Sequence, residues 1–358
     1  MTVIRVEVAP RAYDVVVGPV EAGIERIVDL ARGAAPVLVS EPRVFALHGA
    51  RMAEALGAQP ILVPEGEAAK DWGELHKLLA ALAGLNVSRD TPIVALGGGS
   101  VGDLAGLAAS IFKRGCPVVH MPTTLLSQAD SAIGGKTAID AFGEKNLVGT
   151  FHQPALVVAD PAFLDTLDER QLRSGYAEIV KYGLIDDPAF FVWCEANGRG
   201  VLAAHRDLRE QAICSAIRAK ARIVAGDVID RSGQRALLNL GHSFAHAIES
   251  EAGLGKVLHG QAVALGMAIA FRFSSELGLC PAADTDRVIA HLADAGLPVR
   301  LADVGLAGRG QKLAVWIQRD KKNAAGKVAL VLAHGIGRAF LDRSVDERRL
   351  SAFLDRAA

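Results

Sequence analysis

Three histidines lie within one short stretch of the chain, Asn239–His259, with the sequence NLGHSFAHAIESEAGLGKVLH. His242 and His246 are four residues apart, so on a helix they share one face, and Glu249 follows on the same side. His259 comes after a Gly-x-Gly break, at the start of a second apolar segment. Two or three imidazoles beside a carboxylate are typical of a catalytic zinc site. The spacing alone leaves both a metal site and an ordinary pair of structural histidines open.

A glycine-rich turn, Ile93–Gly106 (IVALGGGSVGDLAG), is the second candidate for chemistry. An apolar strand runs into Gly97, Gly99 and Gly102, which match G-x-G-x-x-G, and helical spacing follows. Such glycines let backbone N–H groups approach a pyrophosphate at a helix N-terminus. The acidic residue that usually follows about 20 residues later is missing, because the next strand ends in PVVHMP. The motif therefore leaves a βα turn without a ligand as the alternative.

The segment AIGGKT, residues 132–137, imitates the end of a P-loop. The first glycine of that motif would fall on Asp130, so we reject a Walker A site. What remains is a glycine-rich loop with donors suited to phosphate, namely Lys136, Lys145 and Asn146. The alternative for each lysine is a solvated surface side chain.

Glu178 and Lys181 lie three residues apart in the segment YAEIVK. On a surface helix, such a pair would be worth only about 0.3–0.5 kcal/mol. The apolar neighbours Ile179, Val180 and Tyr182 instead indicate a helix buried on more than one side. A buried glutamate needs a cation or a metal, so this pair is a further candidate for the site.

The overall composition excludes several classes of protein. The 358 residues suggest two domains or one large one, and the net charge of −1 does not indicate binding to nucleic acid or to a membrane. The four cysteines are scattered, which argues against a disulfide framework and suits a reducing compartment. We see no signal peptide and no apolar run of about 18 residues, so we expect a cytoplasmic protein.

Short apolar strands alternate with helices in the first half of the chain. We expect strands at 3–8, 13–17, 36–40, 59–63, 92–96, 117–121 and 154–160, and helices at 20–31, 44–56, 72–85 and 101–112. This alternation predicts a parallel, Rossmann-like sheet covered on both faces, in an α/β domain that spans residues 1–167.

Helical spacing dominates from about Asp168 onward. We expect helices at 169–185, 188–197, 208–227, 242–252, 259–277, 283–295 and 310–321, with a short hairpin at 327–332 and 337–340. The second domain, residues 168–358, is therefore predicted to be mainly α-helical. A substrate cleft between two such domains is the usual arrangement.

Taken together, these motifs resemble the 3-dehydroquinate synthase family of sugar-phosphate cyclases. The matching segments follow the family's order and cover most of residues 60–330: EGEAAK (65–70), GGGSVGDLAG (97–106), MPTTLLSQADSAIGGKTAI (121–139), GEKNLVGTFHQP (143–154), GYAEIVKYG (175–183), LLNLGHSFAHAIE (237–249) and HGQAVALGM (259–267). Their joint occurrence is specific, although no single motif decides the match.

The resemblance implies a dehydroquinate synthase-like fold with a bound NAD⁺ and one divalent metal, zinc or else cobalt. The family's metal ligands map onto Glu178, His242 and His259, so His246 becomes a residue that contacts the substrate and Glu249 loses its candidacy as a ligand. The NAD⁺-binding segments map onto Glu65, Gly66, Glu67, Ala68, Ala69, Lys70, Gly99, Ser100, Val101, Gly102, Asp103, Thr123, Thr124, Lys136, Lys145, Phe163, Leu164, Asp165 and Thr166.

The implied substrate, 3-deoxy-D-arabino-heptulosonate 7-phosphate, carries a carboxylate and a phosphate. The residues that match its pocket are Arg114, Asp130, Lys136, Asn146, Lys181, Lys220, Arg235, Asn239, His246 and Lys321 or its neighbour Lys322, with Lys145 beside them. The implied reaction forms 3-dehydroquinate and phosphate through transient oxidation by NAD⁺, phosphate elimination, re-reduction and aldol cyclisation. The family also implies a homodimer.

Two residues depart from the family pattern, and two other activities stay open as alternatives. Gln261 stands where the family usually has Glu, and Ala245 replaces a common Gly; we expect activity to survive both. Another sugar-phosphate cyclase would share the NAD and metal motifs, but Arg235, Asn239 and His246 favour the carboxylate substrate. A metal-dependent alcohol or glycerol dehydrogenase would share the two-domain plan without the phosphate-binding cluster. A non-catalytic relative is disfavoured by the intact set of metal ligands.

Overall fold

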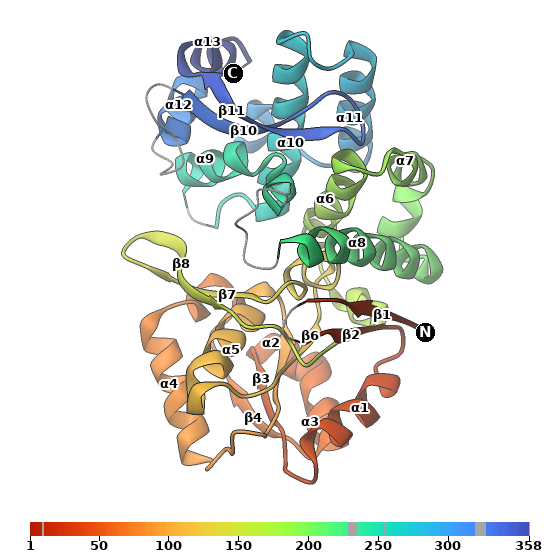
Figure 1. Cartoon of the computed structure of the whole chain (residues 1–358), viewed down its shortest axis with the longest axis vertical. Helices are drawn as coiled ribbons and strands as arrows, with labels where there is room; N and C mark the ends of the chain where they lie inside the picture. The colour runs from red at the N-terminus through yellow and green to blue at the C-terminus, as the bar shows by residue number, and fades with distance from the viewer. Residues whose placement is uncertain (9–10, 228–234, 254, 319–326, 358) are drawn as a thin grey trace. The chain divides into compact units, whose positions relative to one another are not determined.

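The chain folds into two compact units, described here by a computed structural model that covers residues 1–8, 11–227, 235–253, 255–318 and 327–357 (Figure 1). The first unit comprises Met1–Asp168 and the long helix α8 (Arg206–Gly226), and the second comprises Glu169–His205 and the described residues from Arg235 onward. The predicted boundary at 167/168 placed α8 in the second domain. The structure groups α8 with the first unit because it packs against β1 and against the helical turns η4 (Ser127–Ser131) and η5 (Pro161–Thr166).

Within the described residues, the first unit contains one seven-stranded sheet in the order β1-β2-β9-β6-β5-β3-β4. Its strands are β1 Thr2–Val6, β2 Tyr13–Val17, β3 Val37–Ser40, β4 Gln59–Leu62, β5 Ile93–Gly97, β6 Val118–Pro122 and β9 Leu156–Ala159. All neighbours pair in parallel except β1, which pairs antiparallel with β2. Every residue of β3, β5, β6 and β9 is buried, as a parallel sheet with two covered faces requires. The predicted Rossmann-like sheet is confirmed.

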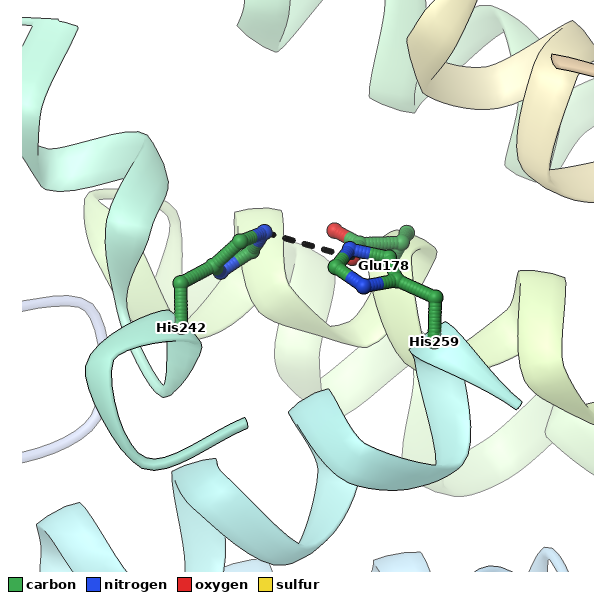
Figure 2. Close-up of side chains that lie close together, drawn as sticks. All are labelled: Glu178, His242 and His259. Atoms are coloured by element: carbon green, nitrogen blue, oxygen red, sulfur yellow. Dashed lines mark ion pairs between the residues drawn. The ribbon is translucent and has the colours of Figure 1, made fainter. Parts of the chain in front are cut away.

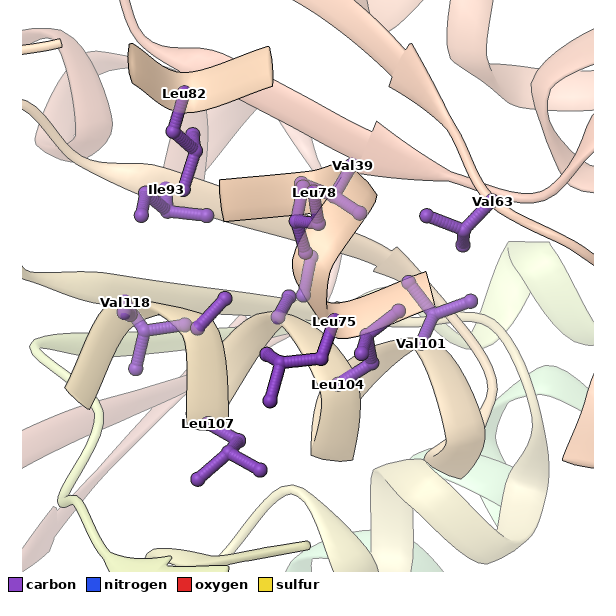
Figure 3. Packing of buried hydrophobic residues seen from close by; sticks show 14 of the residues in the cluster. Val39, Val63, Leu75, Leu78, Leu82, Ile93, Val101, Leu104, Leu107 and Val118 are labelled. Carbon is purple, nitrogen blue, oxygen red and sulfur yellow. The ribbon is translucent and has the colours of Figure 1, made fainter. Parts of the chain in front are cut away.

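Helices cover both faces of this sheet because its apolar side chains alternate between them. On one face, Leu75 and Leu78 of α4 (Trp72–Gly84) and Leu104 of α5 (Gly99–Ile111) pack with Ile93 and other strand residues (Figure 3). On the other face, residues of α1 and of the segment α2-η1-α3 pack with Leu38, Val94 and Leu96. Those helices span α1 Glu21–Ala31, α2 Pro42–Val44, η1 Phe45–Gly49 and α3 Ala50–Leu56.

A β-hairpin stands where the sequence analysis predicted only a glycine-rich loop. Its strands are β7 (Lys136–Ala141) and β8 (Glu144–Phe151), and they pair antiparallel from Lys136 opposite Phe151 to Ala141 opposite Glu144. The hairpin packs on α5, where Gly106 leaves room for Thr137: a Cβ at Gly106 would lie 2.5 Å from Thr137 Cγ2. The lysine-bearing segment is therefore held by a rigid element, which corrects the loop prediction.

The second unit is mainly helical, as predicted. Its elements are α6 Glu169–Ile185, α7 Pro188–Leu202, η6 Arg235–Asn239, α9 His242–Ala252, α10 His259–Glu276, α11 Ala282–Asp294, η7 Leu301–Val304, α12 Gly310–Gln318, the antiparallel pair β10 Lys327–Ala333 and β11 Ala339–Asp346, and α13 Glu347–Ala357. Helix α13 is absent from the predicted elements, although its Leu350, Phe353 and Leu354 are buried at helical spacing. The predicted end of α12 at Lys321 lies outside the described residues.

A search of the described residues for membrane spans finds no helix with the length and apolar character that crossing a bilayer requires.

We predict that Leu104→Ala destabilises the first unit by about 2–5 kcal/mol, because it leaves a cavity in the cluster under the sheet. Urea denaturation followed by circular dichroism measures the shift in midpoint. Val28→Ala, at an exposed position of α1, is the matched control and should change the free energy of unfolding by less than about 0.5 kcal/mol. Equal effects of the two substitutions would contradict this account of the core.

Candidate active site

Glu178, His242 and His259 come together in the second unit, from three different helices (Figure 2). Oε1 of Glu178 lies 3.7 Å from Nε2 of His242 and 3.6 Å from Nε2 of His259. One ligand atom from each residue lies within 4.8 Å of the other two. Tetrahedral zinc with bonds of about 2.0–2.2 Å would hold its ligand atoms about 3.4 Å apart, so a small contraction of this triad would accommodate the ion.

The burial of Glu178 is the strongest sign that the triad binds a cation. Every residue of α6 from Ser174 to Ile185 is buried, and the side chain of Glu178 is 1% exposed. Among the residues that the structure describes, none donates a hydrogen bond to either carboxylate oxygen, although Nζ of the equally buried Lys181 forms an ion pair with Oε2 at 2.6 Å. A buried carboxylate is costly unless it is paired or coordinates a metal. Oε1 faces both imidazoles, so the donor set fits a divalent metal.

The two histidines present the same ring nitrogen to Glu178 but have different environments. Nδ1 of His242 lies 3.2 Å from the carbonyl oxygen of Leu240, so an Nδ1–H donor there leaves the Nε2 lone pair toward Glu178. Burial, together with Lys181 and the neighbouring histidines, lowers the pKa of His242 well below its ordinary value. Burial also acts to lower the pKa of His259, but Glu249 and Glu178 outweigh it and the net pKa is raised.

Two glycines allow the helices to hold the residues of the triad this close. Gly241 precedes His242 and has φ +81°, a backbone conformation that residues other than glycine rarely adopt. Gly260 follows His259, and a Cβ there would lie 1.8 Å from the carbonyl oxygen of Ser174 on α6. The N–H of Gly260 donates to Oγ of Ser174 at 3.0 Å. The start of α10 therefore contacts the helix that carries Glu178.

Other predicted substrate residues of the second unit lie near the triad or in the same segment. The ring of His246 has its centroid 6.0 Å from that of His242 and 6.4 Å from that of His259. Arg235, buried, begins η6 and Asn239 ends it, three residues before His242. Lys321 and Lys322 lie outside the described residues.

The predicted NAD⁺ segments follow the carboxyl ends of four parallel strands of the first unit. Residues 65–70 follow β4, 99–103 follow β5, 123–124 follow β6 and 163–166 follow β9. Because carboxyl ends of parallel strands share one edge of a sheet, these segments gather where open α/β sheets bind ligands. A pocket at this edge is lined by Ala95, Gly97, Gly98, Gly99, Gly102, Asp103, His120, Pro122, Ser127, Ser131, Ala132 and Lys136.

Lys70, Asp103 and Asn146 form a polar cluster beside this pocket. Nζ of the buried Lys70 donates to Oδ2 of Asp103 at 2.8 Å and to Oδ1 of Asn146. Burial raises the pKa of Asp103, although Lys70 opposes the shift. Lys70 therefore links Asp103, another predicted cofactor residue, to Asn146 on the hairpin. Lys145, also on β8, has an exposed side chain.

The remaining predicted residues of the first unit fall into two groups. Nζ of Lys220 on α8 pairs with Asp130, donating to its carboxylate and, at 2.8 Å, to its carbonyl oxygen. Arg114 is not brought to the pocket, because it follows the C-terminal end of α5 whereas Gly99 at the other end lines the pocket. Thirteen residues of α-helix, about 20 Å, separate the two ends.

Gln261 and Ala245, the two departures from the family pattern, lie within three residues of His259 and His242 in the sequence. Oε1 of Gln261 accepts hydrogen bonds from the N–H of Leu258 at 3.2 Å and from Nη2 of Arg170 at 3.2 Å. The neutral amide thus caps α10 and still accepts from a cation. Ala245 is fully buried in α9.

His120 and Glu249 are two residues near the candidate sites that the sequence analysis did not select. His120 lines the pocket in the first unit, and burial lowers its pKa to about 4, so it is neutral near pH 7. Its signal in the sequence is a single titratable residue within an otherwise apolar strand. Glu249 was set aside as a ligand, but its Oε2 lies 3.5 Å from Nδ1 of His259.

Solved structures with this fold define the class to which the architecture belongs. A 2-deoxy-scyllo-inosose synthase in complex with carbaglucose-6-phosphate, NAD⁺ and Co²⁺ superposes with a TM-score of 0.89 at 25% identity, covering 100% of both chains. A 2-epi-5-epi-valiolone synthase from Streptomyces hygroscopicus subsp. jinggangensis, with NAD⁺ and Zn²⁺ bound, gives 0.87 at 30% identity over 97% of both. The fold is that of the dehydroquinate synthase-like sugar-phosphate cyclases.

Sequence comparisons give the family. The model of the 3-dehydroquinate synthase N-terminal region matches residues 60–174, and that of the C-terminal region matches residues 175–323. A 3-dehydroquinate synthase from Zymomonas mobilis subsp. mobilis is 50% identical over 296 residues, which cover 82% of this chain and 78% of the relative. The chain therefore belongs to the 3-dehydroquinate synthase family.

We predict that His242→Ala or His259→Ala weakens Zn²⁺ binding to the metal-free protein by more than about 100-fold. Each substitution removes a proposed ligand, and the loss of a residue that only hydrogen-bonds to a ligand already lowers metal affinity by about 10–100-fold. Competition with a chromophoric chelator measures the affinity. His76→Ala, an exposed imidazole on α4, is the control and should leave the Kd unchanged. Equal Zn²⁺ affinity in all three variants would contradict the proposed ligand set.

Proposed function

We propose that the chain converts 3-deoxy-D-arabino-heptulosonate 7-phosphate to 3-dehydroquinate and phosphate, with NAD⁺ and one divalent metal as cofactors. The observation that carries the proposal is the convergence of Glu178, His242 and His259 in a chain whose family membership extends over residues 60–323. In the cell, the reaction would belong to aromatic amino-acid biosynthesis through the shikimate pathway. Zinc is the proposed metal, with cobalt as an alternative, since related structures hold one or the other.

The proposed cofactor sites use residues already placed by the fold. Glu178, His242 and His259 would hold the metal, which as a Lewis acid would acidify a substrate hydroxyl. The strand-end segments of the first unit would hold NAD⁺, which would accept and return a hydride within one turnover. The N-terminus of α5, with Gly99 and Gly102, offers backbone N–H groups and a positive helix end to a pyrophosphate.

The chain's cations suit a substrate that carries about three negative charges near neutral pH. In the second unit, we propose that Lys181, Arg235, Asn239 and His246 orient the substrate beside the metal. Lys181 also pairs with Glu178, because its ammonium lies 2.6 Å from Oε2 of that carboxylate and both side chains are buried. These groups would contribute by fixing orientation and by stabilising developing charge.

In the first unit, we propose that Lys136, Asn146 and the pair of Asp130 with Lys220 contact the substrate. Lys136 begins β7 and lines the pocket, so the hairpin fixes its backbone. Asp130 accepts from Lys220, which holds that ammonium against η4 despite its burial. Arg114 and Lys321 complete the proposed set, and Lys321 lies outside the described residues.

Sequence identity favours this reaction over that of the other cyclases. The chain is 50% identical to a 3-dehydroquinate synthase but only 25% and 30% identical to the inosose and valiolone synthases. A dehydrogenase is not favoured, since both family models describe 3-dehydroquinate synthases. We also propose that the enzyme acts as a homodimer in the cytoplasm, where its four buried free cysteines would stay reduced.

We predict that the purified protein releases inorganic phosphate from the heptulosonate phosphate without accumulating NADH. Chelator should abolish turnover, added Zn²⁺ or Co²⁺ should restore it, and Glu178→Ala should lower it by at least about 100-fold, because metal assistance contributes several kcal/mol. Phosphate release and NADH absorbance are followed together, with Glu25→Ala, an exposed glutamate on α1, as the control. Turnover insensitive to chelator would refute the metal assignment, and NADH accumulation on a polyol would favour a dehydrogenase.

A further inference from the structure

His259 is the most exposed of the three proposed ligands. It is the first residue of α10, and its side chain is 36% exposed, against 14% for His242 and 1% for Glu178. A ring at this position needs an outside partner to fix its orientation and to decide which nitrogen carries the proton. Figure 2 shows the ring extending from the start of α10 toward Glu178.

Both ring nitrogens of His259 face carboxylates. Nε2 lies 3.6 Å from Oε1 of Glu178, and Nδ1 lies 3.5 Å from Oε2 of Glu249 on α9. Glu249 is only 9% exposed, so water competes little for its contact with His259. A proton on Nδ1 of His259 would point to this carboxylate and would leave the Nε2 lone pair directed toward Glu178.

His242 shows the same arrangement with a different kind of partner. Its Nδ1 lies 3.2 Å from the carbonyl oxygen of Leu240, and its Nε2 faces Glu178. In both imidazoles, Nε2 therefore faces Glu178 and Nδ1 faces a hydrogen-bond acceptor. His242 uses a backbone carbonyl two residues away, whereas His259 uses a charged side chain from another helix.

We propose that Glu249 is a positioning residue for the metal ligand His259. Its carboxylate accepts a hydrogen bond from Nδ1–H of His259, fixes the ring with Nε2 toward Glu178 and makes Nε2 a stronger metal ligand, as outer carboxylates do for metal-bound histidines. This proposal rests on the metal site of the proposed function.

The position of Glu249 on α9 gives this contact a second consequence. Glu249 lies seven residues, or about two helical turns, after His242 on the same helix. Helix α9 therefore carries both the proposed ligand His242 and the residue that positions His259, the proposed ligand on α10. The spacing of α9 from α10 sets the distance between the two imidazoles and the orientation of the second.

The test compares the Zn²⁺ affinity of the full-length wild-type protein with that of Glu249→Gln and Glu249→Ala. Glu249→Gln keeps the shape and an acceptor but loses the charge, so we expect a Kd about tenfold weaker; Glu249→Ala should approach 100-fold. The absorption spectrum of the Co²⁺-loaded protein should shift in both variants. Thermal melting of each metal-free protein should show no matching loss, which separates a positioning role from a structural one.

The matched control is Glu251→Gln, two residues further along α9. Glu251 pairs with Arg309 and Lys312 at 3.5 and 3.6 Å, away from His259, so its loss should leave the Kd and the Co²⁺ spectrum unchanged. Wild-type affinity in both Glu249 variants, or an equal loss in Glu251→Gln, would overturn the inference. Failure of the wild-type protein to bind metal would overturn the proposed function as well, so the two failures are distinguishable.

Discussion

The buried carboxylate of Glu178 is the constraint on which the second unit depends. It belongs to a helix that is buried from Ser174 to Ile185, and its oxygens accept no hydrogen bond from the described part of the chain. Such a charge is tolerated only beside compensating groups, and the chain provides Lys181 on one oxygen and two imidazoles near the other. A divalent ion at this point would complete the compensation, so the burial of Glu178 is a structural cost that a metal offsets.

The helices around Glu178 are shaped to place the imidazoles beside it. Gly260 brings the start of α10 against Ser174 on α6, and Gly241 turns the chain into α9 immediately before His242. In the first unit, polar groups are also brought together by regular elements. The loops after the parallel strands meet at one edge of the sheet, and the β7-β8 hairpin fixes Lys136 at the pocket. In both units the regular elements determine where the polar groups meet.

Much of this could be predicted from the sequence because the signals were local and strongly periodic. Runs such as PVLVS and IVALG predict buried parallel strands, and helical spacing located α6, α9 and α10 to within a residue or two. Spacing alone also identified the histidine stretch, but it paired His242 with His246. The choice of His259 and Glu178 came from the family resemblance. Local periodicity relates residues within one helix, whereas Glu178, His242 and His259 belong to three different helices.

The errors have physical causes of the same kind. The segment KTAIDA alternates buried and less buried residues as a strand does, and Phe142 and Gly143 both have positive φ, as a tight hairpin turn requires. Its glycines and lysines resembled a phosphate-binding loop instead, so the hairpin was missed. Helix α8 has ordinary helical periodicity, and nothing in its sequence says which unit it packs against. The role proposed for Glu249 depends on the separation of α9 and α10, which sequence spacing does not specify.

Anomalous diffraction from crystals of the Zn²⁺-loaded protein tests the central claim most directly. The account predicts one strong peak per chain within about 2.0–2.2 Å of a carboxylate oxygen of Glu178 and of Nε2 of both His242 and His259. A peak coordinated by His246, or by Nδ1 of His259 with Glu249 as a ligand, would contradict it.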